Sequence, residues 1–198
     1  MWARSIVALC FAMAAILAGG CGRSEPGARF MLTDVTGASL GRNLNLLDHH
    51  GKPRALTDFH GKVVVVFFGF VHCPDVCPVT LAELATVARD LGKDADRLQV
   101  LFVTVDPERD TPEVLRQYVP SFDPRFLGLY GDAEATARAA KEFKIFYQKQ
   151  PQKEGKSYSV DHSAGTFILD RQGRLRLFAR YGAGAPALLH DIRILLAS

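Results

Sequence analysis

The chain has 198 residues, of which 48% are hydrophobic and 23% are charged, and its formal net charge at pH 7 is +3. These values are typical of one globular domain with a short appendage, large enough to bury a core without stabilising disulfides or metals. Lysine and arginine form no run or stripe, which excludes the basic surface of a typical nucleic-acid-binding protein. We therefore expect no nucleic acid among its partners.

The first 20 residues indicate an exported protein. A single basic residue, Arg4, precedes an apolar segment from Ile6 to Leu17, which is shorter than the roughly 20 residues of a transmembrane helix. Small residues then precede Cys21, as in a bacterial lipoprotein signal. This pattern predicts a signal peptide over residues 1–20 and a lipid on Cys21. Leu17 lies one place farther from the cysteine than usual, so an uncleaved short anchor is the alternative.

The predicted lipid places the rest of the chain at the bacterial cell membrane, facing the periplasm. Residues 21–29 have almost nothing to bury and are expected to form a tether, followed by one folded domain over residues 30–198. An oxidising compartment makes cysteines informative. Once the signal and its cysteine are removed and Cys21 carries lipid, Cys73 and Cys77 are the only free pair.

Apolar runs and helical patterns alternate from residue 30 onward. The expected strands cover residues 30–34, 44–48, 63–71, 98–105, 126–130, 166–169 and 175–180. The expected helices cover residues 78–88, 112–119, 133–143 and 186–196, with an exposed hairpin or flap in the polar residues 144–156. The strand, helix, strand order predicts a parallel pair with a right-handed crossover. The whole order is that of an α/β, thioredoxin-like fold with an N-terminal β extension and an inserted hairpin.

The central feature of the sequence is the apolar run 63–71, which leads directly into Cys73 and Cys77 and then into a helix. Open α/β sheets usually carry their chemistry in such a crevice between a strand end and a helix start. The helix dipole there favours thiolates, which attack disulfides and bind soft metal ions. If the turn is already helical, both sulfurs share one face. A structural disulfide or two inert thiols is the alternative.

A histidine is expected to join the two cysteines. In the predicted fold order, the loop before strand 166–169 approaches the loop after strand 63–71, which places His162 beside Cys73 and Cys77. Two thiolates and one imidazole suit copper or zinc, although structural zinc usually has a fourth ligand. A lone histidine before a strand is more often a satisfied polar residue, so the fold order carries this interpretation.

Two other polar groups invite a functional reading. His49 and His50 lie in a predicted turn, where paired histidines are more often solvated than bound to metal. The charged segment 106–112 follows strand 98–105 and should emerge on the same sheet edge as the cysteines. It could brace the loop, face a partner, or cap the helix that begins at Pro112.

Three segments of the sequence resemble the signatures of the Sco/SenC family, and the similarity extends from Phe30 to the C-terminus. The segments, in family order, are residues 68–78, 105–112 and 161–164. Members are thioredoxin-like, membrane-tethered proteins that assist assembly of the binuclear copper centre of cytochrome c oxidase. The resemblance implies that Cys73, Cys77 and His162 bind copper. It also assigns Asp106 and Asp110 to an acidic loop that recognises a partner or shapes the site.

The resemblance implies a copper chaperone that carries Cu(I) or Cu(II) to subunit II of the oxidase. Its other expected partners are periplasmic copper donors or thiol reductants and the membrane. The main alternative is a thiol–disulfide oxidoreductase that uses Cys73 and Cys77 as a redox-active pair to reduce the oxidase's cysteines. The CxxxC spacing argues mildly against it, because thioredoxin-like redox enzymes use CxxC. A peroxidase on the same fold is a third and weaker possibility.

Overall fold

The computed structural model describes residues 29–151 and 158–198. The predicted signal peptide, the lipidation site Cys21 and almost all of the predicted tether lie outside the described residues. Among the helices in the described part of the chain, none is long and apolar enough to span a bilayer.

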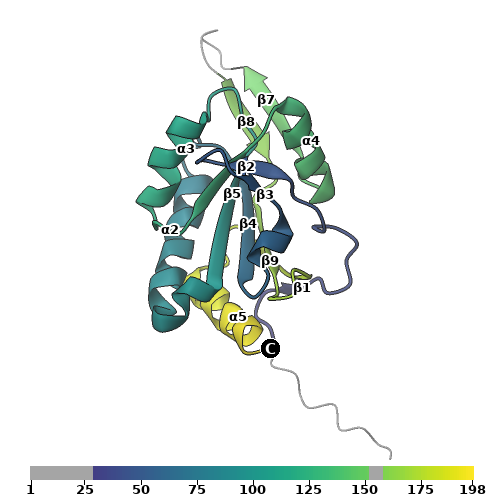
Figure 1. The fold of residues 1–198 in the computed structure, drawn as a ribbon, viewed down its shortest axis with the longest axis vertical. Coiled ribbons are helices and arrows are strands. Elements are labelled where there is room, and N and C mark those ends of the chain that lie inside the picture. Colours follow the sequence, from purple (N-terminus) through teal and green to yellow (C-terminus); the bar gives the residue numbers. More distant parts are fainter. Residues whose placement is uncertain (1–28, 152–157) are drawn as a thin grey trace, which may run out of the picture.

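An eight-stranded mixed sheet forms the centre of the domain (Figure 1). Its strands are β1 (Thr33–Asp34), β2 (Leu46–Asp48), β3 (Pro53–Arg54), β4 (Val63–Gly69), β5 (Leu98–Thr104), β6 (Leu127–Tyr130), β9 (Gly165–Leu169) and β10 (Leu175–Arg180). The strand order is β1-β10-β9-β4-β5-β6-β2-β3. β4, β5 and β6 run parallel, whereas β9 is antiparallel to both β4 and β10. This arrangement confirms the predicted thioredoxin-like fold with an N-terminal β extension.

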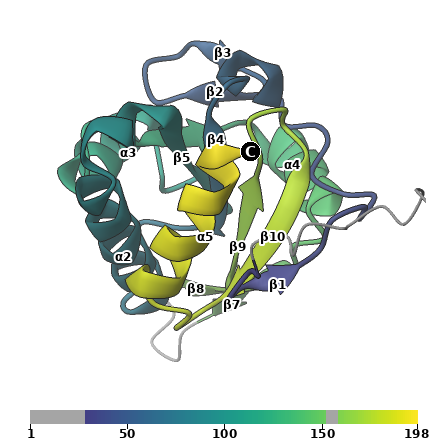
Figure 2. The same ribbon diagram turned by 90° about the horizontal axis from the view of Figure 1, so that it is seen from below.

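Helices cover both faces of the sheet. They are α2 (Val76–Asp90), α3 (Pro112–Tyr118), α4 (Ala133–Glu142) and α5 (Ala185–Ala197), with short 3₁₀ turns at Leu56–Phe59, Gly92–Arg97 and Val119–Ser121. One core cluster joins the sheet to α2, α3 and α5, and a second joins its other face to α4 and the N-terminal strands. Figure 2 shows α2 and α4 on opposite sides of the sheet. The domain therefore has three layers.

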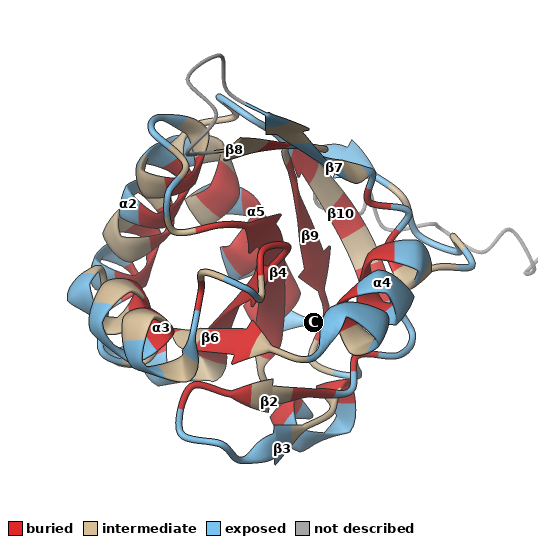
Figure 3. Ribbon diagram, turned by 90° about the horizontal axis from the view of Figure 1, so that it is seen from above, coloured by how far each residue is buried: buried red, intermediate tan, exposed pale blue. Residues whose placement is uncertain are grey.

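β4 lies in the middle of these layers and is buried on both faces, as predicted. All seven of its residues are buried. Side chains alternate along a strand, so Val65 and Phe67 enter the cluster with α2 while Val66 and Phe68 enter the cluster with α4. Figure 3 shows β4 as a continuously buried strand at the centre. A rigid central strand thus delivers the cysteine loop.

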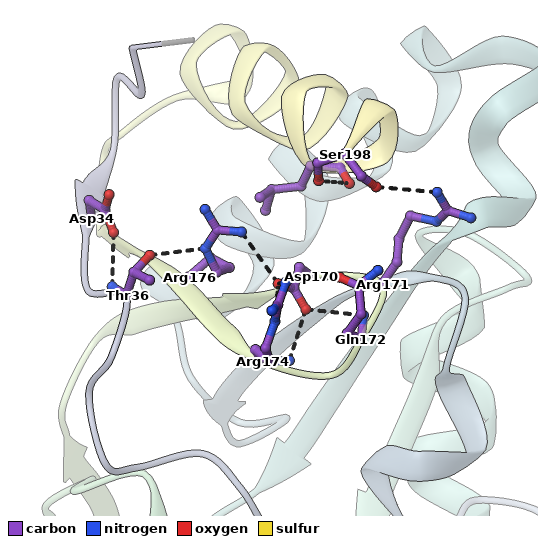
Figure 4. A network of polar contacts seen from close by, with 9 residues as sticks. Asp34, Thr36, Asp170, Arg171, Gln172, Arg174, Arg176 and Ser198 are labelled. Carbon is purple, nitrogen blue, oxygen red and sulfur yellow. Dashed lines mark hydrogen bonds and ion pairs between the residues drawn. The ribbon is translucent and has the colours of Figure 1, made fainter. Parts of the chain in front are cut away.

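The predicted turn after strand β9 is organised by one buried carboxylate (Figure 4). Asp170 accepts backbone hydrogen bonds from Gln172 and Arg174 at 3.0 Å each, and a side-chain bond from Arg174 at 2.9 Å. Arg176 reaches the same carboxylate at 3.3 Å and donates to the Thr36 hydroxyl at 2.9 Å. The network holds the N-terminal extension against the β9–β10 hairpin.

The inserted hairpin differs from its prediction. Its first strand, β7 (Tyr147–Pro151), lies within the expected segment, but it pairs with β8 (Tyr158–His162) in a separate two-stranded sheet. Residues 158–165 were expected to form the loop that leads into the next strand. That expectation is wrong because residues 158–162 pair with β7, and the alternation of Tyr158 and Val160 with polar residues is too short to indicate a strand. His162 therefore ends a strand.

Candidate metal centre

The cysteine loop lies between β4 and α2. Cys73 lies in the turn, whereas Cys77 lies in the first turn of the helix, which begins at Val76. The turn is not helical at Cys73, so the condition under which both sulfurs would share a helical face is not met, and both cysteines are free thiols. At Gly69, a Cβ atom would lie 2.7 Å from Cys77 Sγ. The glycine at the end of β4 thus makes room for the buried sulfur.

His162 approaches this loop from the end of β8. Its Nε2 lies 3.8 Å from Cys77 Sγ, and its Nδ1 lies 3.1 Å from the carbonyl oxygen of Ser163. A carbonyl only accepts, so Nδ1 carries the proton and the Nε2 lone pair faces the sulfur. Phe70 packs edge-to-face on the imidazole, with ring centroids 5.9 Å apart. These contacts hold the ring in the tautomer that a metal ligand needs.

The ligand atoms of Cys73, Cys77 and His162 all lie within 4.8 Å of one another. Cys77 is fully buried, whereas Cys73 and His162 are half-buried. A hydrogen bond from the Cys77 side chain, backbone N–H groups and nearby His162 together lower the pKa of Cys73 to about 5. The same hydrogen bond and burial raise the pKa of Cys77. At neutral pH the two sulfurs therefore share one proton. Cys77 is the thiol, and Cys73, the more exposed of the two, is the thiolate.

This charge distribution predicts the pH profile of thiol modification. Alkylation of Cys73 in the reduced protein should follow a titration with a midpoint near pH 5. In Cys77→Ala, which removes the main hydrogen-bond donor, the midpoint should move up toward the ordinary thiol value of about 8.5. The measurement is the rate of iodoacetamide labelling at Cys73 by peptide mass spectrometry. Equal midpoints in the two proteins would contradict the shared-proton account.

Comparison with known proteins identifies the family. The family model described as SCO1/SenC matches residues 33–197. The chain belongs to the SCO1/SenC family. The SCO2 homologue of mouse mitochondria is 39% identical over 153 residues, which make up 76% of this chain and 60% of the relative. A SCO2-like protein of Rickettsia prowazekii is 33% identical over 136 residues, or 68% of this chain and 66% of the relative.

Solved structures agree with this assignment. ScoI of Bradyrhizobium japonicum, determined with copper bound, is 38% identical with a TM-score of 0.71, and the match covers 78% of this chain and 98% of that one. Apo Sco1 of Thermus thermophilus is 40% identical with a TM-score of 0.74, covering 85% and 98%. This SCO1/SenC chain spans about three fifths of the length of the mouse relative.

The acidic loop of this SCO1/SenC member lies beneath the cysteine loop. Asp106 and Asp110 are both fully buried. Asp110 accepts hydrogen bonds from the Val71 backbone at 3.0 Å and the Thr104 hydroxyl at 2.6 Å, and burial raises its pKa to about 6. It thereby ties the cysteine loop to the end of β5. This geometry favours loop shaping over direct contact with a partner, and that role stays a prediction.

The structure does not bring His49 and His50 into the site, and the expectation that both are solvated is wrong for His49. His49 is 1% exposed, and its Nδ1 accepts a hydrogen bond from Gly128 N at 3.0 Å. Its Nε2 lies 3.1 Å from His50 Nε2. A metal ligand normally donates from its second ring nitrogen, which here would place a proton against the Gly128 N–H. The histidine instead forms a hydrogen bond that links the end of β2 to β6.

This buried hydrogen bond of His49 should make the fold sensitive to acid. Burial and the neighbouring His50 lower the pKa of His49, with a smaller effect of Asp48 against it and of Arg116 in the same direction. A histidine kept neutral by the fold contributes stability that falls as pH drops below its unfolded pKa of about 6.5. We expect the free energy of unfolding in urea to fall between about pH 7.5 and 5.5.

The matched variant for this prediction is His49→Asn, whose amide oxygen can accept from Gly128 without titrating. Its free energy of unfolding should be lower at neutral pH because imidazole packing is lost, but it should depend less on pH. An equally steep decline in the variant would show that another group causes the acid sensitivity.

Two residues of the site were missed from sequence. Gly69 carried a usable signal, because a glycine inside an apolar strand pattern often marks the close approach of another group. Tyr158 carried none, since its contacts are with residues about fifty positions earlier in the chain.

Proposed function

We propose that this protein is a membrane-tethered copper chaperone that binds one copper ion through Cys73, Cys77 and His162. The observation that carries the proposal is the convergence of the three ligand atoms within 4.8 Å. Thiolates favour Cu(I), and an imidazole helps to hold Cu(II). The ScoI structure from Bradyrhizobium japonicum and a Sco1 structure from yeast, 32% identical, were both determined with copper bound.

The recipient in this proposal is subunit II of cytochrome c oxidase, at its binuclear copper centre. Transfer proceeds by ligand exchange, in which each copper–sulfur bond to this chain breaks as a bond to a reduced cysteine of the recipient forms. Cys73 is the more exposed sulfur and has the lower pKa, so it is the first to be displaced. Cys77, which is buried, and the half-buried His162 hold the ion until a second recipient ligand arrives.

The proposed location is the bacterial cell membrane, with the domain in the periplasm. It is supported by the signal pattern of residues 1–20 and the lipidation context of Cys21. In that compartment, copper donors load the site and thiol reductants keep the cysteine pair reduced. A cysteine pair that oxidises cannot bind copper through thiolates.

The second candidate function is a thiol–disulfide oxidoreductase that reduces the recipient's cysteines. One observation favours it, because the low pKa of Cys73 beside the protonated Cys77 is the arrangement of an attacking thiolate and a resolving thiol. His162 separates the two functions. Retention of Cu(II) needs the imidazole, whereas attack of Cys73 on a disulfide does not.

The test compares His162→Ala with His60→Ala, a control at an exposed histidine outside the site. Each reduced protein is assayed for bound copper, for the thiolate-to-Cu(II) absorption band and for exchange with a small disulfide. The chaperone proposal predicts loss of the band and of Cu(II) retention in His162→Ala alone, with disulfide exchange kept. Wild-type protein that exchanges disulfides but retains no copper would favour the oxidoreductase.

A further inference from the structure

The strand that carries His162 lies outside the main sheet. Within residues 29–151 and 158–198, β7 and β8 pair with each other and with no other strand, and Figure 1 shows this hairpin at the end of the domain opposite α5. At the C-terminal side of β8, the chain enters β9 three residues after His162. At its N-terminal side, no ladder of backbone bonds fixes β8 to the domain among the described residues. Side-chain contacts must therefore set its position there.

Val160, in the middle of β8, packs into the core cluster that contains α4. The polar contacts of the N-terminal side of β8 come from the acidic loop and meet at its first residue. The Tyr158 hydroxyl donates to Asp106 Oδ1 at 2.7 Å, and Arg109 Nη1 donates to the Tyr158 carbonyl oxygen at 2.8 Å. The Arg109 guanidinium also lies 3.7 Å from the centroid of the Tyr158 ring. Asp106, in turn, accepts from Arg109 Nε. We call Tyr158, Asp106 and Arg109 the Tyr158 clamp.

The clamp also reaches the ring that supports the histidine. The Arg109 guanidinium lies 5.9 Å from the centroid of Phe70, and Phe70 packs edge-to-face on His162. Phe70 is buried at the end of the central strand. The Arg109 guanidinium thus contacts both Tyr158, the first residue of β8, and Phe70. Phe70 in turn packs on His162, the last residue of β8. Movement of β8 away from the cysteines would break each of these contacts.

We propose that Tyr158 is a positioning residue for copper: the clamp keeps His162 against the thiolates and so strengthens binding of Cu(II) more than that of Cu(I). This inference rests on the proposed function, because it requires His162 to be a copper ligand. Cu(I) is satisfied by two thiolates, whereas Cu(II) gains from the imidazole. The clamp would therefore set how firmly the protein holds the oxidised ion without changing its capacity for the reduced one.

The test is Tyr158→Phe, which removes the hydroxyl and keeps the ring on which Arg109 stacks. The matched control is Tyr130→Phe, at a half-buried tyrosine on β6. Copper-loaded proteins are mixed with excess chelator, and the decay of the Cu(II) charge-transfer band is followed. Loss of a hydrogen bond to a charged acceptor predicts a Cu(II) dissociation rate about tenfold faster in Tyr158→Phe. Cu(I) affinity should stay within about twofold of wild type.

Two further measurements separate positioning from a structural effect. The unfolding midpoint of the copper-free protein shows whether the variant is globally weakened, which would lower the affinity for both ions. A double-mutant cycle with His162→Ala shows whether Tyr158 acts through the histidine, with the Cu(II) affinity of all four proteins measured by competition with a weak chelator because His162→Ala loses the absorption band. We expect Tyr158→Phe to add nothing to His162→Ala.

The outcomes distinguish this inference from the proposed function. Wild-type protein that binds no copper would overturn both. Wild-type binding with Cu(II) dissociation unchanged in Tyr158→Phe, or with equal weakening of Cu(I) and Cu(II), would overturn the positioning role alone. Additive effects of Tyr158→Phe and His162→Ala would also overturn it.

Discussion

Replacing Cys73 with serine should weaken Cu(I) binding by more than about 100-fold if Cys73 is a copper ligand as proposed, because loss of a ligand exceeds the 10- to 100-fold cost of losing a residue that only supports one. A hydroxyl is a poor ligand for Cu(I), which selects soft thiolates. Cys73 is half-buried and its neighbours lie in a turn, so the substitution leaves the core intact. The measurement is competition for Cu(I) against a coloured chelator.

The control for this prediction is the unfolding midpoint of the copper-free variant, which should match wild type within a few degrees. Wild-type stoichiometry and affinity in Cys73→Ser would show that the copper site is elsewhere.

Replacing Gly69 with alanine should damage both the fold and the site. The new Cβ would lie 2.7 Å from Cys77 Sγ and 2.9 Å from Phe102 Cε2, and all three residues are buried. Overpacking of this kind costs about 1–3 kcal/mol in the free energy of unfolding. The sulfur must also shift from its present position 3.8 Å from His162 Nε2, so we expect copper affinity to fall well beyond the loss of stability. Urea unfolding and copper competition measure the two effects.

Gly131→Ala is the matched control for that variant. Its Cβ would meet Ala135 Cβ at 2.8 Å and Leu46 Cδ2 at 2.9 Å, which is a similar steric conflict far from the cysteines in the chain. We expect a comparable loss of stability with copper affinity preserved. Equal loss of copper affinity in both variants would mean that global destabilisation, and not displacement of Cys77, explains the result at Gly69.

The sequence predicted the parts of the fold that depend on local patterns. The uncharged, β-branched and aromatic run 63–71 predicted a strand buried on both faces, and β4 is that strand. The fold order also placed His162 near the cysteines, because loops at the same sheet edge must approach one another.

The remaining features depend on contacts that local patterns do not encode. β8 forms because its backbone pairs with β7, and its alternation, Tyr158 and Val160 between polar residues, is too short to distinguish a strand from a loop. Burial of His49 depends on Gly128, which lies 79 positions later in the chain. The Tyr158 clamp likewise joins the first residue of β8 to two residues of the loop after β5. Each of these is a tertiary interaction of polar groups, for which spacing along the sequence gives no rule.

The proposed delivery of copper to subunit II can be tested in a transfer experiment. The protein loaded with one copper ion is mixed with the reduced, copper-free soluble domain of cytochrome c oxidase subunit II, and the two are separated and analysed for metal. We expect copper to move to subunit II and to give the spectrum of the binuclear centre. Transfer from this protein should be faster than transfer from an equal amount of copper held by a small thiol. Copper that stays on this chain, or loading no faster than from the small thiol, would contradict it.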